Sequence, residues 1–186
     1  ETSEVAAAIR DQYTPRGMDG KLPETRVGQI VSLADRLDTV AAFFAAGLTP
    51  KGSEDPFALR RQALSIVRLV VEGGLRLDVA AALRRATESV QPHVKEAVKV
   101  VDDPLPFLLE RFRFYVATTH RARADLIEAV TGGAAAAGAV DLVDLLERIH
   151  ALQTIAGRPE FDPLIVGFKR AHRLVLKEKW TTAALA

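Results

Sequence analysis

Hydrophobic residues recur every three or four positions along most of this chain, which is the spacing of helices that bury one face. The clearest stripe consists of Val27, Ile30, Val31, Ala34, Leu37, Ala41, Phe44 and Ala45. Gly47 follows this stripe, and glycine is common where a helix ends. No convincing alternation of hydrophobic and polar residues indicates a β-strand. The pattern therefore predicts an all-α protein.

The dipeptide Asp-Pro occurs at 55–56, 103–104 and 162–163, each time before an amphipathic stretch. Aspartate accepts hydrogen bonds from the free amides of a first helical turn, and the fixed φ of proline suits the first helical position. Each copy therefore predicts the start of a helix. The other expected helices cover about 78–90 with Asp78 as cap, 92–101, 121–131 and 140–156. Glycine and proline predict loops at 13–24, 47–55 and 132–138.

Two acidic residues and two prolines interrupt the helical pattern between Val101 and Pro106. This interruption predicts two helical units, residues 1–102 and residues 103–186. The second unit begins with an apolar stripe of Leu105, Leu108, Leu109, Phe112 and Val116. Each unit is expected to pack its apolar helix faces together and to leave its charged faces outside.

The composition is that of an ordinary globular chain, with 48% hydrophobic and 26% charged residues among 186. The absence of cysteine excludes disulfides, thiolate zinc sites and a cysteine nucleophile, and it fits a reducing cytoplasm. No stretch approaches the roughly 18 apolar residues of a membrane helix, and no signal-peptide pattern occurs. We therefore expect a soluble, cytoplasmic protein with no membrane partner. Because the chain begins at Glu1 without a methionine, we expect a piece of a longer protein.

Positive charge is concentrated in two short segments, although the net charge of the whole chain is only +1. Residues 111–123 contain four arginines and no acid, and residues 169–179 contain five basic residues against Glu178 alone. A solvated helix face and a nucleic-acid contact both fit such segments.

Asp35 and Asp38 share one helix surface, because they are three residues apart, and Asp38 falls on the apolar stripe. Spaced carboxylates can bind a divalent cation, but metal-dependent hydrolases of the HD class add a His-Asp dipeptide and further histidines. None of the four histidines in this chain precedes an aspartate. We therefore expect no metal site. Instead, we expect structural ion pairs from these aspartates to Arg60 and Arg61.

Several motifs in the first 64 residues stand out together: Tyr13-Thr14-Pro15, Asp19, Leu22-Pro23, Ala34-Asp35-Arg36-Leu37-Asp38-Thr39, Gly52-Ser53 and Asp55-Pro56-Phe57-Ala58-Leu59-Arg60-Arg61-Gln62-Ala63-Leu64. Weaker motifs follow: Phe107-Leu108-Leu109-Glu110-Arg111-Phe112, Asp125-Leu126-Ile127-Glu128-Ala129-Val130 and Lys169-Arg170. Together they resemble the beta subunit of bacterial tetrameric glycyl-tRNA synthetase, of which this chain would be a C-terminal piece. One departure is Arg173, which stands where that family commonly has asparagine.

The resemblance implies an HD-like helical domain over residues 1–102 and a helical anticodon-binding-like domain over 103–186. It also implies binding of tRNA(Gly) and docking to the alpha subunit, which carries the aminoacylation site and uses ATP and magnesium. This chain would then bind no cofactor itself and would not act on DNA. The residues agree, since the sequence has neither a glycine-rich phosphate loop nor a Ser-His-Asp grouping.

The candidate tRNA contacts are the basic residues of the two segments: Arg111, Arg113, Arg121, Arg123, Lys169, Arg170 and Arg173. Two other functions stay open. One is a degenerate HD-type metal-dependent phosphohydrolase domain, and the other is a helical protein-interaction module without an RNA role.

Overall fold

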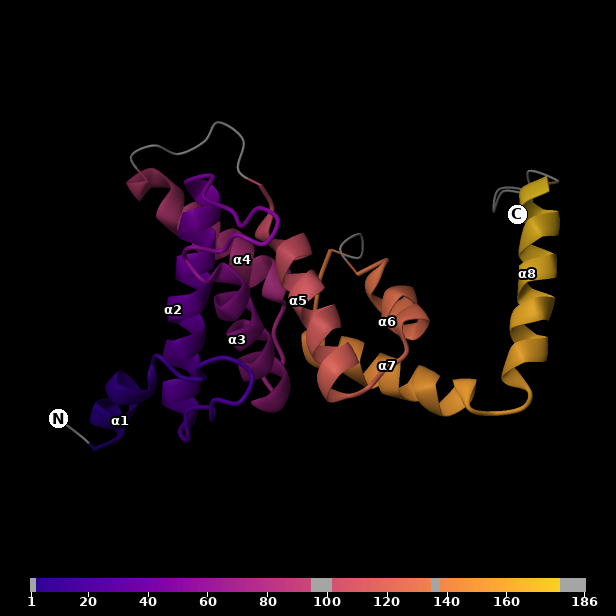
Figure 1. Ribbon diagram of the computed structural model, residues 1–186, viewed down its shortest axis with the longest axis horizontal. Coiled ribbons are helices and arrows are strands. Elements are labelled where there is room, and N and C mark those ends of the chain that lie inside the picture. The colour runs from indigo at the N-terminus through magenta and orange to yellow at the C-terminus, as the bar shows by residue number, and fades with distance from the viewer. Residues whose placement is uncertain (1–2, 95–101, 135–137, 178–186) are drawn as a thin grey trace, which may run out of the picture. The chain divides into compact units, whose positions relative to one another are not determined.

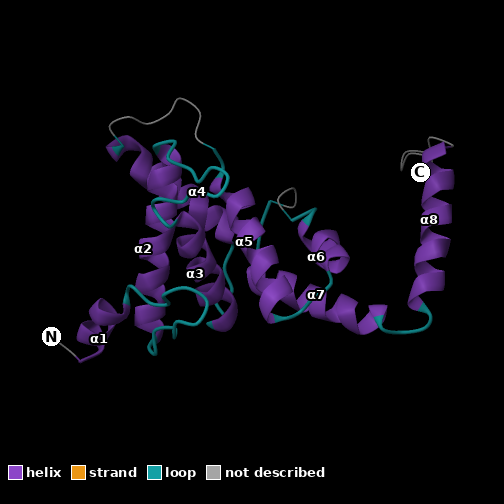
Figure 2. Ribbon diagram, viewed as in Figure 1, coloured by secondary structure: helices purple, strands orange, loops and turns teal. Residues whose placement is uncertain are grey.

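The computed structural model describes residues 3–94, 102–134 and 138–177. These residues form α1 (Ser3–Asp11), α2 (Arg26–Ala45), α3 (Leu59–Glu72), α4 (Val79–Val90), the short 3-10 helix η1 (Gln91–His93), α5 (Pro104–Thr119), α6 (Ala124–Thr131), α7 (Leu142–Ala156) and α8 (Phe161–Lys177). Within the described ranges there is no β-strand, as Figure 2 shows. The prediction of an all-α protein is confirmed.

The helices divide into two compact units, residues 1–149 and residues 150–186. In the first unit α2 packs against α1, α3 and α4, while α3 also packs against α5 and α5 contacts α6 (Figure 1). Packing does not separate the chain near residue 103, because α5 begins there and its side chains join the core of the first unit. The domain boundary that the sequence predicts near residue 103 concerns the domains of the family and not compact packing units, and it stays a prediction.

Helix α3 lies at the centre of the first unit. Every residue from Ala63 to Val70 is buried, so this helix is enclosed on all sides over two turns. A helix that is buried all round is typical of the middle of a bundle. Only two polar side chains, Ser65 and Arg68, belong to this buried stretch, and both contact the loop between α1 and α2.

Aspartate side chains cap α4 and α5, as the sequence predicts. The Asp78 carboxylate accepts hydrogen bonds from the amides of Ala80 and Ala81 at 3.0 and 3.2 Å. The Asp103 carboxylate accepts one from the amide of Leu105 at 2.9 Å, with Pro104 in the first turn. These bonds satisfy amides that have no partner inside their own helix.

The first Asp-Pro sequence differs, because α3 begins three residues after Pro56. The backbone of Ala58 takes the left-handed conformation, with φ of 55°, just before the helix. The Asp55 carboxylate still accepts hydrogen bonds from Leu59 and Arg60 amides at 2.8 and 3.0 Å. Asp55 therefore caps the helix across a turn instead of from the adjoining position.

Helix α2 is rotated relative to the stripe that the sequence pattern predicts. Its first three apolar positions, Val27, Ile30 and Val31, are exposed, whereas Leu33 and Arg36 are buried. The second half follows the prediction more closely, with Ala41, Phe44 and Ala45 buried. Gly47 has φ of 70° after the last turn, which confirms it as the glycine that ends the helix.

The remaining expected elements have shifted bounds. Residues 91–93 form the 3-10 helix η1, while 95–101 lie outside the described residues, as do 135–137 of the predicted loop. The helix expected from 121 begins at Ala124, and that expected from 140 begins at Leu142. Shifts of this size are common at helix ends, where capping geometry decides the first residue.

The second unit contains the end of α7 and the whole of α8. No residue of α8 is buried, and Asp162 and Pro163 lie in its first turn. None of the helices that the structure describes combines the length and the apolar character needed to cross a membrane.

Candidate functional site

The four residues expected to form ion pairs are not brought together. Asp38 is exposed and Asp35 is half-buried, and no ion pair joins either of them to Arg60 or Arg61 within the described ranges. The Arg60 guanidinium instead donates to the backbone carbonyl oxygens of Gly52 and Glu54 at 2.5 and 3.3 Å. The rotation of α2 explains why the expected ion pairs do not form, because an aspartate that faces solvent needs no internal partner.

In the segment from Ala34 to Thr39, the buried ionisable residue is Arg36. Only 4% of its surface is exposed. Its guanidinium donates to the carbonyl oxygens of Gln12 and Pro15 at 2.8 and 3.1 Å, and to Ser32 Oγ at 2.7 Å. Burial lowers the pKa of the Arg36 guanidinium, and the charge of neighbouring Asp35 raises it by less. The Nε atom of Arg36 is buried and makes no hydrogen bond.

A second buried arginine, Arg68 of α3, also binds the loop between α1 and α2. It donates to the carbonyl oxygens of Gly17 and Gly20, both at 2.7 Å. Unlike Arg36 it has an acidic partner, Glu72, whose carboxylate lies 2.6 Å from its Nε. The hydrogen bond to Glu72 raises the pKa of Arg68 despite its burial. The hydroxyl of Tyr115 also donates to Glu72, at 3.2 Å.

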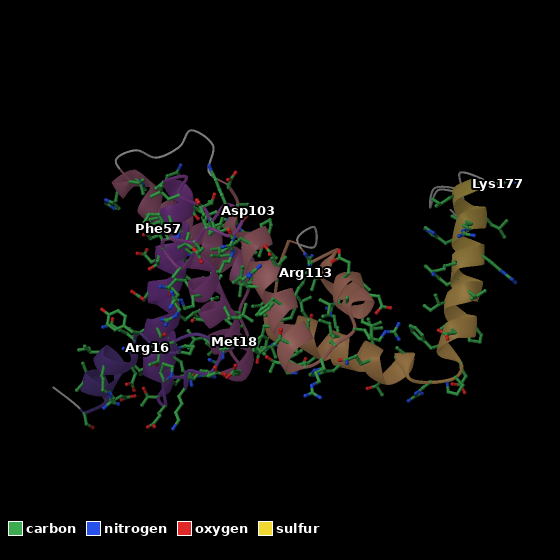
Figure 3. All side chains as sticks on the ribbon, viewed as in Figure 1. Arg16, Met18, Phe57, Asp103, Arg113 and Lys177 are labelled. Carbon is green, nitrogen blue, oxygen red and sulfur yellow. The ribbon has the colours of Figure 1, made fainter. Side chains whose placement is uncertain are left out.

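A cavity of about 200 Å³ lies between this loop and the first turns of α3. We call it the arginine pocket; the side chains lining it include Tyr13, Arg16, Arg36, Arg61, Gln62 and Ser65. Figure 3 labels Arg16 on the loop that borders the pocket. No acidic residue lines the pocket, and the described chain provides no ion pair to Arg16 or Arg61. The pocket is therefore a concentration of positive charge.

Sequence reasoning missed this pocket, although one signal was present. Arg36 continues a helical series with Leu33, Val40 and Phe44, and these three apolar residues are buried with it. A series that contains an arginine is discounted when only apolar residues are counted. The long loop from 13 to 24 gave no sign that its carbonyl groups bind arginines.

The basic segment 111–123 is largely neutralised by acids that lie just outside it. The Arg111 guanidinium pairs with Glu110 and also lies over the ring of Phe114, with 5.9 Å between the guanidinium carbon and the ring centroid. Arg113 donates to Thr131 Oγ1 at 2.7 Å, and its Nε lies 3.6 Å from a carboxylate oxygen of Glu128.

The other two arginines of the segment differ from each other. Both nitrogens of the Arg123 fork donate to the Asp125 carboxylate, at 3.1 and 2.7 Å. Arg121 is exposed, has a backbone φ of 50°, and forms no ion pair with any described residue. Of these four candidates, Arg121 alone keeps its charge unpaired within the described chain.

The basic residues of α8 differ from most of the arginines in 111–123. Lys169, Arg170, Arg173 and Lys177 are all exposed, and none forms an ion pair in the part of the chain that the structure describes. At about 100° of rotation per residue, the four side chains fall within an arc of about 100°. Figure 3 labels Lys177 on this helix. We call these four residues the basic face of α8.

The side of α8 opposite its basic face is apolar and equally exposed. Leu164 and Phe168 each expose 64% of their surface, and Val175 exposes 48%. The helix is thus amphipathic, although the residues described in its own unit do not cover its apolar side.

Candidate metal ligands are not gathered anywhere in the described ranges. No group of three histidine, aspartate or glutamate side chains there is close enough to hold a metal ion. Asp35 and Asp38 therefore have no described ligands to complete a metal site. The described residues thus form an all-α protein in which cations without described ion-pair partners gather in the arginine pocket and along the basic face of α8.

Similarity to known proteins extends over nearly the whole chain. Residues 1–132 match the family model of the glycyl-tRNA synthetase beta subunit. The glycine–tRNA ligase beta subunit of Geobacter sulfurreducens is 43% identical over 176 residues, 94% of this chain and 25% of that protein. The corresponding subunit of Myxococcus xanthus is 38% identical over 182 residues, 96% of this chain and 25% of its own length.

A third relative, the glycine–tRNA ligase beta subunit of Rhodospirillum centenum, is 40% identical over 178 residues, 95% of this chain and 24% of its own length. The chain spans about a quarter of the length of the curated relatives it matches. It belongs to the glycyl-tRNA synthetase beta subunit family. The resemblance seen in its motifs is therefore confirmed.

Proposed function

We propose that this chain contributes tRNA(Gly) binding and subunit assembly to a cytoplasmic glycine–tRNA ligase. In this proposal the ATP- and magnesium-dependent joining of glycine to tRNA occurs on the alpha subunit. The relatives are beta subunits of glycine–tRNA ligases, and the observation that carries the RNA-binding part is the basic face of α8, which has no ion-pair partner among the described residues.

The basic face of α8 suits a phosphate backbone. Lysine and arginine side chains that neutralise phosphates release condensed counterions, which supplies most of the salt-dependent part of RNA affinity. A cation already paired with a carboxylate contributes less, because that pair must be broken first. We therefore place Lys169, Arg170 and Arg173 before the arginines of 111–123 as tRNA contacts, with Arg121 next.

Subunit assembly is the second part of the proposal. Apolar residues are exposed on α1 and on the first half of α2, and those of α2 belong to the stripe that the sequence pattern predicted to be buried. They are Val5 and Ile9 on α1 and Val27, Ile30 and Val31 on α2. Exposed apolar side chains gathered on neighbouring helices are typical of protein interfaces, and the alpha subunit is the partner that we propose.

The test of RNA binding is a titration with tRNA(Gly) and with a non-cognate tRNA at several salt concentrations. We expect the triple variant K169Q/R170Q/R173Q to bind tRNA(Gly) more weakly. The slope of log affinity against log salt should become shallower by about 2 to 3, since each of the three lost phosphate contacts removes about 0.7 to 0.9. Equal affinities for the two tRNAs at every salt concentration would show a nonspecific basic surface and would contradict tRNA(Gly) recognition.

A matched control removes three charges elsewhere. Lys21, Lys51 and Arg85 are exposed in the first unit and form no ion pair with any described residue. The variant K21Q/K51Q/R85Q should keep the affinity and slope of the unmodified chain. If both triple variants lose affinity equally, the effect is one of net charge, and the proposed role of α8 is wrong.

A further inference from the structure

The arginine pocket holds positive charge that its neighbours do not balance. Arg36 is 4% exposed, and each hydrogen-bond acceptor that it uses is a neutral oxygen: the carbonyls of Gln12, Pro15 and Ser32, and the Ser32 hydroxyl. Its Nε is buried without a partner. Buried charges in proteins are normally paired, because an isolated ion loses its hydration.

Two aspartates lie near this region, but neither lines the pocket. Asp35 adjoins Arg36 in sequence and acts on it only through space, without an ion pair within 4.0 Å among the described contacts. Asp55 is occupied by the amides of Leu59 and Arg60 at the start of α3. The cationic side chains of the pocket therefore have room for an anion between them.

The dimensions of the pocket select a small anion. Pockets that enclose drug-sized ligands usually measure about 300 to 1,000 Å³, and this one measures about 200 Å³. Guanidinium groups present several N–H donors in a plane, an arrangement that matches the oxygens of a phosphate. Gln62 adds an amide that forms no hydrogen bond with described residues, and the exposed ring of Tyr13 lies at the rim.

We propose that the arginine pocket binds a phosphate group, held by Arg16 and Arg61 at its mouth and by the charge of Arg36 behind them. Two sources share this chemistry, the phosphate of a free mononucleotide and a phosphate of an RNA backbone. The inference does not rest on the proposed role of α8, because the pocket belongs to the first unit and inorganic phosphate alone tests it.

The experiment is a titration of the protein with inorganic phosphate at constant ionic strength, with chloride as the balancing anion. We expect saturable binding that the double variant R16Q/R61Q weakens by about tenfold or more, since hydrogen bonds to charged groups are the stronger ones. The side chains of these two arginines are exposed and form no hydrogen bond or ion pair with described residues, so their replacement should preserve the fold. The matched control K51Q/R85Q should bind phosphate as the unmodified protein does.

A second measurement reports on Arg36 without changing it. The side-chain Nε–H resonance of Arg36 should shift when phosphate is added to the unmodified protein, and it should shift at much higher phosphate concentrations in R16Q/R61Q. Absence of saturable binding, equal affinity in the two double variants, or an Arg36 resonance that phosphate leaves unmoved would each overturn the proposal.

Further titrations distinguish the two sources. If a mononucleotide is the natural occupant, a nucleoside monophosphate should bind more tightly than inorganic phosphate. If RNA is the occupant, tRNA should displace phosphate, and the monophosphate should bind no more tightly than phosphate itself. The α8 variant K169Q/R170Q/R173Q should keep full phosphate affinity, so failure of the tRNA proposal and failure of this one are separable.

Discussion

Replacement of Asp78 by alanine should destabilise the first unit more than loss of an ordinary helix cap. Besides the two amides of α4, the Asp78 carboxylate accepts a hydrogen bond from the amide of Val140 at 2.9 Å. Val140 is only 1% exposed and directly precedes the segment that leads into α7. One side chain therefore both caps α4 and fixes a distant loop against it.

The expected loss combines two effects. Removal of an aspartate cap costs about 1 kcal/mol, within a range of about 0.5 to 2. The buried amide of Val140 would lose its acceptor, which costs about 1 to 3 kcal/mol. The ion pair with Arg84 spans 4.0 Å near the surface and adds little. We therefore expect D78A to lower the free energy of unfolding by about 2 to 4 kcal/mol.

The assay is urea denaturation of D78A beside D103A, because Asp103 caps α5 through a single amide. D103A should cost about 1 kcal/mol, and the difference between the variants isolates the contact to Val140. Hydrogen exchange at the Val140 amide should accelerate in D78A and stay slow in D103A. If D78A costs no more than D103A and this amide stays protected, the reasoning is wrong.

The same contact predicts a pH dependence. Hydrogen bonds to the carboxylate, above all that from Val140, hold the pKa of Asp78 below its ordinary value of 3.8. A carboxyl with a lowered pKa in the folded state stabilises the protein above the unfolded-state pKa, and this contribution disappears as pH falls through the folded-state pKa. The stability difference between the unmodified protein and D78A should therefore shrink below about pH 4.

Two further predictions concern the backbone and a buried phenol. Gly47→Ala should lower the free energy of unfolding by about 1 kcal/mol, because residue 47 has φ of 70° and side chains disfavour that conformation; urea denaturation measures the loss, and an unchanged stability would contradict it. Burial raises the pKa of Tyr115 to about 12. In Y13F, which leaves Tyr115 as the one tyrosine, an ultraviolet titration should show the phenol ionising near pH 12. The free energy of unfolding should fall as pH rises from about 10 toward 12.

The sequence was most informative where local bonds decide the structure. An aspartate before a helix binds amides two or three residues ahead, so Asp78 and Asp103 could be recognised as caps from sequence alone. Gly47, which ends α2, could be recognised for the same reason, because its role depends on its own backbone conformation. By contrast, the third contact of Asp78 joins residues that are 62 positions apart, and no pattern near either residue indicates it.

Tertiary packing explains why the predicted buried face of α2 and the predicted ion pairs of Asp38 were wrong. Helix α2 presents Arg36, not Val27 or Ile30, to the interior, because the loop after α1 offers carbonyl groups that an arginine can bind and a valine cannot. The expected pairing of Asp38 failed for the same reason, since rotation of the helix moved that residue to the surface. Counting hydrophobic residues alone cannot detect a buried position that is selected for hydrogen bonding.

The charge clusters show a related effect. Residues 111–123 contain no acid, yet Glu110 lies one residue before this segment and Asp125 two residues after it, and both pair with its arginines. The α8 cluster looks less basic by composition, because it includes Glu178, but its cations share one face without described partners. The availability of a charge for RNA depends on what already binds it, which the structure supplies and composition does not. This is why α8 carries the proposed tRNA contact, while most of the arginines in 111–123 already pair with carboxylates.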